Sequence, residues 1–176
     1  MKKTFLYFTI GLLSNANCFA TTQVPDYLIY KGDTLMLFSN PLEQFIKNQQ
    51  LPDSLFRNRL RLSSCARGYI AYWELKNDSL FLTKINKYPY GRDRRIDTIN
   101  LNNIFNKKGK IFADWVTDTL YSPYGKLLRI EYGYGSAFEN NKLFYFKNGI
   151  LQKTSEYKNI MKYTKYYFNK DKLEKY

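Results

Sequence analysis

A repeated pattern of two apolar strands joined by a tight turn constrains the fold of this chain more than any other feature. The clearest turn is Asn148-Gly149, because both residues tolerate the positive φ that a two-residue hairpin requires. Runs of β-branched and aromatic residues flank this turn and recur around two earlier turns. The three predicted hairpins span residues 27–38, 68–85 and 143–151. The sequence therefore predicts that antiparallel strands make up most of the fold.

Two short helices are expected among these strands. Asn40 has the position of an N-cap, Pro41 that of a first helical residue, and Glu43 that of the partner in a capping box. A second helical turn is expected at residues 101–105, where apolar side chains recur at helical spacing. Residues 53–64 fit either a further helical turn or an edge strand, and the pattern leaves both open.

Strands and turns dominate the second half of the chain. Gly125 is expected to break residues 120–132 into two strands, and Gly133 and Gly135 are expected to act as bulges. The last segment, residues 160–176, fits one more hairpin better than a Lys-rich amphipathic helix. The resulting fold class is mainly β with some α. We expect an antiparallel β-sandwich or a partly closed barrel, built from successive hairpins with one or two short helices.

The N-terminus resembles an export signal. Lys2 and Lys3 precede an apolar run at residues 5–13 that is too short to span a bilayer, and Ala20 is the small residue that signal peptidases favour. We therefore expect residues 1–20 to be a signal peptide. The remainder, from Thr21 to the end, is long enough for a single exported domain, either periplasmic or extracellular.

The chain has two cysteines, Cys18 within the expected signal peptide and Cys65 after it. Cys18 could instead be a lipid anchor, although Asn17 stands where a lipoprotein signal needs a small residue. Cleavage would remove Cys18 and leave Cys65 alone, so no disulfide within the chain is expected. A single remaining cysteine is more often a buried thiol than a bridge between chains.

The chain is strongly basic, with 28 Lys and Arg against 15 Asp and Glu and a net charge of +13. Removal of Lys2 and Lys3 leaves +11, which favours anionic partners. Outside the cell these would be an acidic protein or an anionic envelope polymer, whereas export disfavours nucleic acid. A Lys-rich, Asn-rich composition is also typical of an A/T-rich genome, so part of the charge has that origin.

The composition argues against several classes of enzyme. The chain contains no His, which removes the usual base of serine and cysteine triads and the commonest zinc and iron ligand. It has no phosphate-binding Gly-Lys-Ser/Thr loop and no dinucleotide fingerprint. We therefore expect no metal site and no cofactor, and a binding role before a catalytic one.

Carboxylates are the one catalytic class that the composition leaves open. Five acids lie on or beside strands rich in Trp and Tyr: Glu74, Asp114, Asp118, Glu131 and Glu139. Two carboxylates flanked by aromatic rings are what glycoside cleavage requires. Glu74, Glu131 and Asp114 are the candidates for this alternative, a carboxylate-dependent enzyme that acts on glycans or the cell wall. The competing interpretation is that each acid is solvated and paired with a Lys.

Aromatic side chains make up 18% of the sequence, and a subset beside Gly or Pro is expected to be exposed. Exposed rings stack on sugars or form the centre of protein interfaces. An Arg-rich loop follows two of these tyrosines, so guanidinium and phenol groups would share one patch. The candidate binding residues are Tyr88, Tyr90, Arg92, Arg94, Arg95, Tyr124, Tyr132 and Tyr134.

Five short segments stand out in the sequence: Gly32-Asp33-Thr34-Leu35, Asn40-Pro41-Leu42-Glu43, Arg67-Gly68-Tyr69-Ile70-Ala71 with Trp73, residues 80–85, and Phe112-Ala113-Asp114-Trp115. Together they resemble segments of small uncharacterised exported proteins of Bacteroidota-type bacteria. This group supplies no catalytic residues to transfer. Some exported proteins of this size are immunity partners that block a toxin from a neighbouring cell, an analogy of size and location alone. The sequence thus favours an exported binding protein, basic and tyrosine-rich, that is either of the immunity type or a binder of an anionic envelope polymer.

Overall fold

The computed structural model describes residues 21–56, 62–89 and 96–159, so the expected signal peptide and the segment 160–176 lie outside the described residues. The chain is mainly β with few short helices, as predicted. The described strands are β1 (Asp26–Tyr30), β2 (Asp33–Leu37), β3 (Tyr69–Lys76), β4 (Ser79–Lys87), β5 (Thr98–Ile99), β6 (Ile111–Phe112), β7 (Thr119–Arg129), β8 (Ala137–Lys147) and β9 (Ile150–Lys158). The described helices are α1 (Pro41–Asn48), a 3-10 turn η1 (Asp53–Leu55) and α2 (Asn102–Phe105).

All three predicted hairpins are confirmed, as β1–β2, β3–β4 and β8–β9. In each two-residue turn both residues have positive φ, a geometry that matches the right-handed twist of the flanking strands. The φ angles are 54° and 90° at Lys31 and Gly32, 49° and 55° at Asn77 and Asp78, and 50° and 75° at Asn148 and Gly149.

The strands form one mixed sheet in the order β2-β1-β3-β4-β9-β8-β7, with β5 and β6 also paired to β4. The pairing of β1 with β3 is parallel, which a succession of hairpins does not predict. It arises because the chain leaves β2, passes through α1 and returns on the other side of β1 to begin β3. Every other described strand pair is antiparallel.

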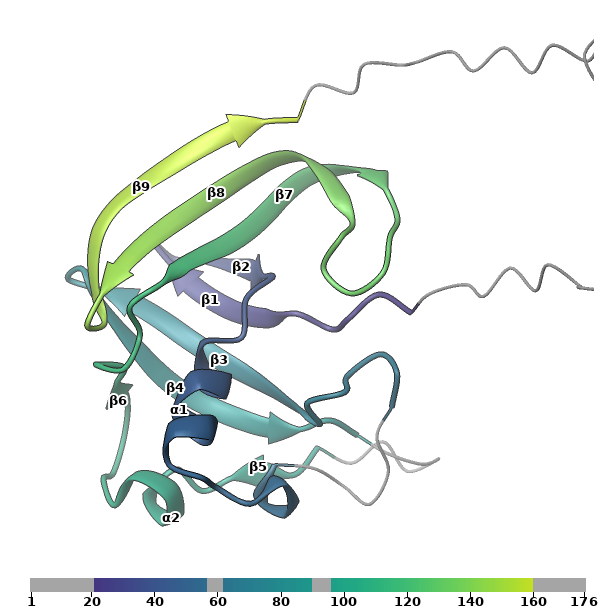
Figure 1. Ribbon diagram of the computed structural model, residues 1–176. Coiled ribbons are helices and arrows are strands. Elements are labelled where there is room, and N and C mark those ends of the chain that lie inside the picture. Colours follow the sequence, from purple (N-terminus) through teal and green to yellow (C-terminus); the bar gives the residue numbers. More distant parts are fainter. Residues whose placement is uncertain (1–20, 57–61, 90–95, 160–176) are drawn as a thin grey trace, which may run out of the picture.

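The sheet bends sharply into two layers, as Figure 1 shows, with β7 to β9 in one and β1 to β4 in the other. The layers are joined at a corner where Ser79 of β4 pairs with Ile150 of β9. At the other side β2 approaches β7, and the Phe38 amide donates to the Tyr121 carbonyl at 2.8 Å. No ladder joins β2 to β7 in the described chain, so the sheet is not closed into a barrel.

The glycines of the second half differ from their predicted roles. Gly125 (φ 83°) does not end a strand, because β7 continues through it with an irregular register opposite β8. Gly133 and Gly135 lie in the loop between β7 and β8, where the Gly135 amide donates to the Tyr132 carbonyl at 2.7 Å. Where we expected two separate strands, the structure thus has one continuous strand, β7, with a shifted register near Gly125.

Helix α1 begins at Pro41 as predicted, but the capping box does not form. The Asn40 side chain makes no cap hydrogen bond, because its Oδ1 accepts the hydroxyl of Tyr134 instead. Glu43 likewise turns to another partner, accepting the hydroxyl of Tyr69 at 2.9 Å. Both side chains therefore fasten α1 to the rest of the fold, a tertiary use that the local pattern does not reveal.

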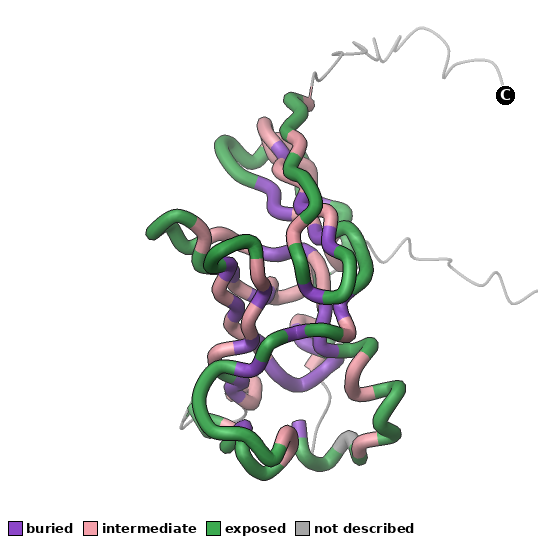
Figure 2. Tube along the Cα trace, turned by 90° about the vertical axis from the view of Figure 1, so that its left-hand side faces the viewer, coloured by how far each residue is buried: buried purple, intermediate pink, exposed green. Residues whose placement is uncertain are grey.

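The core lies between the two layers and beneath α1. Trp73, Leu82 and Phe144 are fully buried, together with Leu42 of α1. Burial of such side chains stabilises a fold by about 1.5–3 kcal/mol each. Figure 2 shows buried residues within the strands and exposed ones in the outer loops and turns, and most residues of β9 are exposed as well. Among the described helices, none is both long and apolar enough to cross a membrane.

Candidate binding sites

A buried ion pair holds the start of β1 against the start of β3. Asp26 is fully buried, and its Oδ1 accepts hydrogen bonds from Arg67 Nη2 at 2.9 Å and from the Ala71 amide at 3.0 Å. Its Oδ2 accepts the indole N–H of Trp73 at 3.3 Å. Burial raises the pKa of Asp26 to about 6, and the nearby Arg67 cation opposes this rise.

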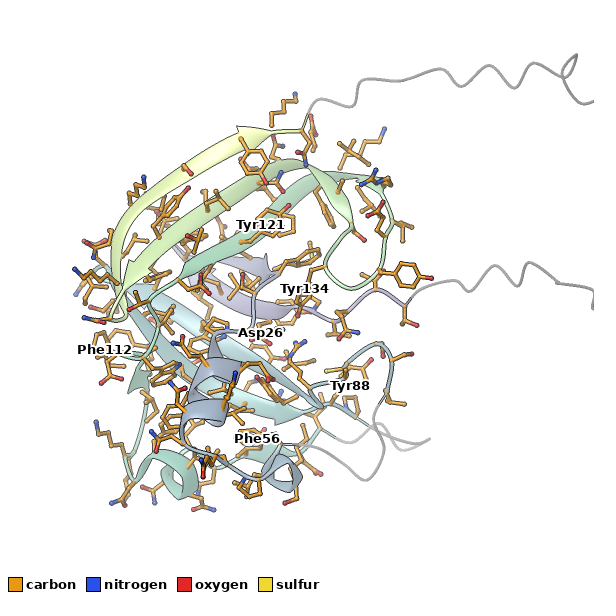
Figure 3. All side chains as sticks on the ribbon, viewed as in Figure 1. Asp26, Phe56, Tyr88, Phe112, Tyr121 and Tyr134 are labelled. Atoms are coloured by element: carbon orange, nitrogen blue, oxygen red, sulfur yellow. The ribbon has the colours of Figure 1, made fainter. Side chains whose placement is uncertain are left out.

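Arg67 connects this carboxylate to a second set of polar groups. Its Nη2 also donates to the Val24 carbonyl at 2.8 Å, and its Nη1 donates to the hydroxyl of Tyr134 at 2.9 Å. The Tyr134 hydroxyl in turn donates to Asn40 Oδ1 at 2.8 Å. The network therefore ties β1, the residues before β3, the β7–β8 loop and the start of α1 together. Figure 3 shows Asp26 and Tyr134 between the two layers.

This network gives Tyr134 a different place from the exposed one that we expected. Its ring is only partly exposed and stacks on Phe38 with ring centroids 5.0 Å apart. Burial raises the pKa of the Tyr134 hydroxyl to about 12. Tyr124 and Tyr132 are exposed as expected, at 36% and 64%. Tyr124 of β7 donates to Glu156 at 2.8 Å, and Tyr132 lies in the loop between β7 and β8.

Tyr88 lies directly after β4 and is partly exposed, whereas Tyr90, Arg92, Arg94 and Arg95 lie outside the described residues. The Tyr88 amide donates to the Gly68 carbonyl at 2.8 Å, which places Tyr88 beside the start of β3. The described residue Asp97, on the far side of the Arg-rich loop, accepts the Lys87 amide at 2.8 Å. Both flanks of that loop are thus held at this end of the sheet.

A second Arg-rich segment has its flanks at the same end. Residues 57–61 contain three arginines and lie outside the described residues, between Phe56 and Leu62. The ring of Phe56 packs on Tyr69 with centroids 5.6 Å apart, and Leu62 forms a bridge with Cys65, three residues before Gly68. Figure 3 shows Phe56 and Tyr88 at this end. The two segments together hold six of the eight arginines of the chain.

Cys65 belongs to this region and is a buried free thiol, the commoner of the two expected outcomes. Its Sγ donates to the Tyr69 carbonyl at 3.2 Å. Burial raises the pKa of the thiol, which disfavours the thiolate that reacts with electrophiles. Cys65 is therefore a packing residue in this structure.

The three acids proposed for the catalytic alternative come from three different parts of the fold. Glu74 of β3 contacts Lys110, and Glu131 in the β7–β8 loop pairs with Arg129 at 3.0 Å. Asp114 lines a pocket whose described lining contains neither Glu74 nor Glu131. Among the described residues that line this pocket there is no second carboxylate, so the geometry offers no support for the paired acids of glycoside cleavage.

Of the other two acids, Asp118 and Glu139 also have structural partners. Asp118 Oδ1 accepts the Thr119 amide at 2.6 Å, and Glu139 pairs with Lys158 at 3.1 Å. The Lys158 ammonium holds the pKa of Glu139 below its ordinary value. The contact of Glu139 agrees with the interpretation of strand acids as partners of Lys, whereas Asp118 bonds a backbone amide.

The pocket beside Asp114 has a volume of about 300 Å³ and an aromatic lining that the sequence did not single out. The ring of Phe45 of α1 stacks on that of Phe105 of α2 with centroids 4.6 Å apart and contacts Trp115 at 4.7 Å, and Phe112 of β6 also lines the pocket. The Trp115 indole N–H donates to the Pro41 carbonyl at 3.0 Å, which fixes its ring. The only sequence signal was that Trp115 and Phe105 flank a Lys-rich loop.

Three polar side chains complete the lining: the Gln49 amide, the Lys107 ammonium and the Asp114 carboxylate. No hydrogen bond or ion pair engages these three side chains within the described part of the chain. Figure 3 shows Phe112, which marks this pocket, on the opposite side of the molecule from Tyr88. The molecule therefore has two separate candidate sites.

No group of three or more His, Cys, Asp or Glu that would suit a metal ion occurs among residues 21–56, 62–89 and 96–159. Comparison with known proteins gives no family for the chain: no protein-family model, no curated protein and no solved structure matches it.

Proposed function

We propose that this chain is an exported binding protein that presents a basic, tyrosine-bearing face to an acidic protein or an anionic envelope polymer. One observation carries the proposal. The residues that flank the two Arg-rich segments, 57–61 and 90–95, meet at the start of β3. Phe56, Cys65 and Tyr88 contact Tyr69 or Gly68, so each segment leaves and rejoins the fold at this end.

The distribution of charge along the chain also supports a basic face at this end of the molecule. The described residues contain 15 Lys and Arg against 12 Asp and Glu, which accounts for only three of the 13 net positive charges. The Arg-rich segments 57–61 and 90–95 contribute much of the remainder. Arginine is better suited than lysine to carboxylates and phosphates, because its planar guanidinium donates two parallel hydrogen bonds. An anionic partner is therefore the best fit to this end of the molecule.

Export is part of the proposal, and it has its own test. If residues 1–20 are a cleaved signal peptide, the mass of the mature protein recovered from the envelope of its host will match a chain that begins at Thr21. A lipid on Cys18 would add the mass of acyl chains instead. Recovery of the full chain from the cytoplasm would contradict export.

An immunity role is the more specific form of this proposal, supported by the size of the chain and its predicted location. Such a protein would bind one acidic toxin domain tightly, whereas a polymer binder would bind many repeating units weakly. Separation of an envelope extract into protein and polysaccharide fractions distinguishes the two.

The deciding experiment measures binding of the mature chain to these two fractions at low salt and at about 0.5 M salt, where surface charges are screened beyond a few ångström. Two variants replace three arginines each with Gln, at Arg57, Arg59 and Arg61 or at Arg92, Arg94 and Arg95. The matched control replaces three exposed lysines at the opposite hairpin turns with Gln, at Lys31, Lys76 and Lys147.

We expect binding at low salt that weakens in high salt, that falls at least tenfold in each arginine variant, and that survives in the lysine control. Equal losses in the arginine and lysine variants would show that net charge, and not this face, attracts the partner. The absence of any binding to either fraction at low salt would refute the proposal.

A further inference from the structure

The aromatic pocket between α1, α2 and β6 is independent of the basic face, and its lining has a definite chemical character. Its lining combines the rings of Phe45, Phe105, Phe112 and Trp115 with the amide, ammonium and carboxylate of Gln49, Lys107 and Asp114. Pockets that bind small molecules combine apolar walls with a few polar groups that orient the ligand. We propose that this pocket binds one or two rings of a neutral saccharide.

The polar groups favour a saccharide over an apolar side chain. A carboxylate, an amide and an ammonium that have no partner in the described chain are suited to a ligand that presents several hydroxyl groups. A purely apolar occupant would cover these groups without satisfying them, and an unsatisfied buried polar group costs about 1–3 kcal/mol. The apolar C–H face of a pyranose ring is suited to the aromatic rings of the lining, and its hydroxyl groups are suited to the polar side chains.

The charge of the lining favours a neutral ligand. Lys107 and Asp114 carry opposite charges, so the described lining has no net charge. An anionic polymer would meet the Asp114 carboxylate as well as the Lys107 ammonium, and like charges repel. This balance separates the pocket from the Arg-rich segments 57–61 and 90–95, which together hold six arginines against one aspartate.

The pocket is small, and three of its aromatic rings are held in place by other residues. Its volume of about 300 Å³ is at the lower end of the range for small-molecule sites, roughly 300–1,000 Å³. The hydrogen bond from Trp115 to Pro41 and the ring stack of Phe45 on Phe105 fix the side chains before a ligand arrives. Pre-organised side chains lose little entropy on binding, which favours affinity for a short oligosaccharide. With a single carboxylate in its described lining, the pocket suits binding better than cleavage.

The experiment titrates the mature chain with chitotriose, cellotriose and maltotriose and follows tryptophan fluorescence. Trp73 is fully buried while Trp115 lines the pocket, so a ligand in the pocket changes the emission of Trp115. We expect saturable binding of at least one trisaccharide at millimolar or lower concentration, unchanged by about 0.5 M salt. Insensitivity to salt distinguishes this site from the basic face.

Two variants assign the binding to the pocket. Phe112→Ala removes a ring that is 38% exposed, and Asp114→Asn replaces an exposed carboxylate by an amide of the same shape, so neither change disturbs the core. We expect each to weaken binding at least tenfold. The controls Tyr132→Ala and Asp33→Asn make the same chemical changes at exposed positions away from the pocket and should bind as the parent does.

Three results would overturn the inference. The first is the absence of saturable binding by all three trisaccharides. The second is binding that the Phe112 and Asp114 variants leave unchanged, which would place the ligand elsewhere. The third is preferential binding of an aromatic peptide over every saccharide, which would make the pocket a docking site for a protein side chain.

Discussion

Replacement of Arg67 by Met tests whether the buried ion pair with Asp26 organises this fold. The substitution keeps most of the length of the side chain and removes the guanidinium. The Arg67 side chain is only 5% exposed. Asp26 then remains fully buried without its cation. Loss of one partner of a buried pair costs about 3–5 kcal/mol, because the other charge is left uncompensated. We expect a loss of that size in the free energy of unfolding at pH 8.

The penalty should shrink in acid. Burial already raises the pKa of Asp26 to about 6 although Arg67 lowers it, so loss of Arg67 raises this pKa further. A carboxyl group whose pKa is higher in the folded than in the unfolded state stabilises the fold while it is protonated. That stabilisation is lost as the pH rises through the folded-state pKa. At pH 4.5 Asp26 is protonated in parent and variant alike, so the variant lacks mainly the hydrogen bonds of Arg67 to Val24 and Tyr134, about 1–2 kcal/mol together.

The assay is urea unfolding followed by tryptophan fluorescence at pH 8 and pH 4.5, since Trp73 contacts Asp26 directly. The matched control is Arg129→Met, which removes an exposed arginine that pairs with Glu131 at 3.0 Å. An exposed pair is worth less than about 1 kcal/mol, so this control should lose less than that at both pH values. A penalty for Arg67→Met that is equal at the two pH values, or larger at pH 4.5, would refute the reasoning.

Two further outcomes test the packing. Gly149→Ala should destabilise the fold by about 2–4 kcal/mol, because φ is 75° and an added Cβ would lie 2.6 Å from the Ala113 carbonyl oxygen. Gly32→Ala has φ of 90° but open space around it, so urea unfolding should show only the backbone strain of roughly 1–2 kcal/mol, and equal losses would contradict this account. Cys65 is fully buried, so a disulfide reagent should label it in urea and not in the native protein, and rapid native labelling would show that the residue is accessible.

The hairpins were predictable because their signals are local. Asn148-Gly149 and Asn77-Asp78 adopt positive φ through their own chemistry, and the flanking residues alternate between the two faces of the sheet. The parallel pairing of β1 with β3 has no such signal. It depends on a crossover of about thirty residues through α1, and nothing in either strand specifies its partner across that distance.

The candidate sites were less predictable, because their residues meet only through tertiary structure. Asp26 and Arg67 are 41 residues apart, and neither stands in a motif. Tyr134 was expected to be exposed because it lies between two glycines, yet its hydroxyl meets Arg67 and Asn40 in the interior. The pocket needs Phe45, Phe105 and Trp115 to converge from α1, α2 and the segment after β6, and only the fold brings them together.

The buried pair also links the stability of the fold to the proposed basic face. Arg67 is followed by Gly68 and Tyr69. The Gly68 carbonyl accepts the Tyr88 amide, and the Tyr69 ring packs on Phe56. Arg67→Met should therefore disturb the end of the sheet where both Arg-rich segments attach, while the pocket at Phe112 lies on the opposite side. Near pH 7 and below the unfolding transition, we expect this variant to lose affinity for an anionic partner and to bind a trisaccharide as the parent does. Equal loss of both activities would mean that the two sites are not independent. The substitution would then weaken both through the stability of the whole fold.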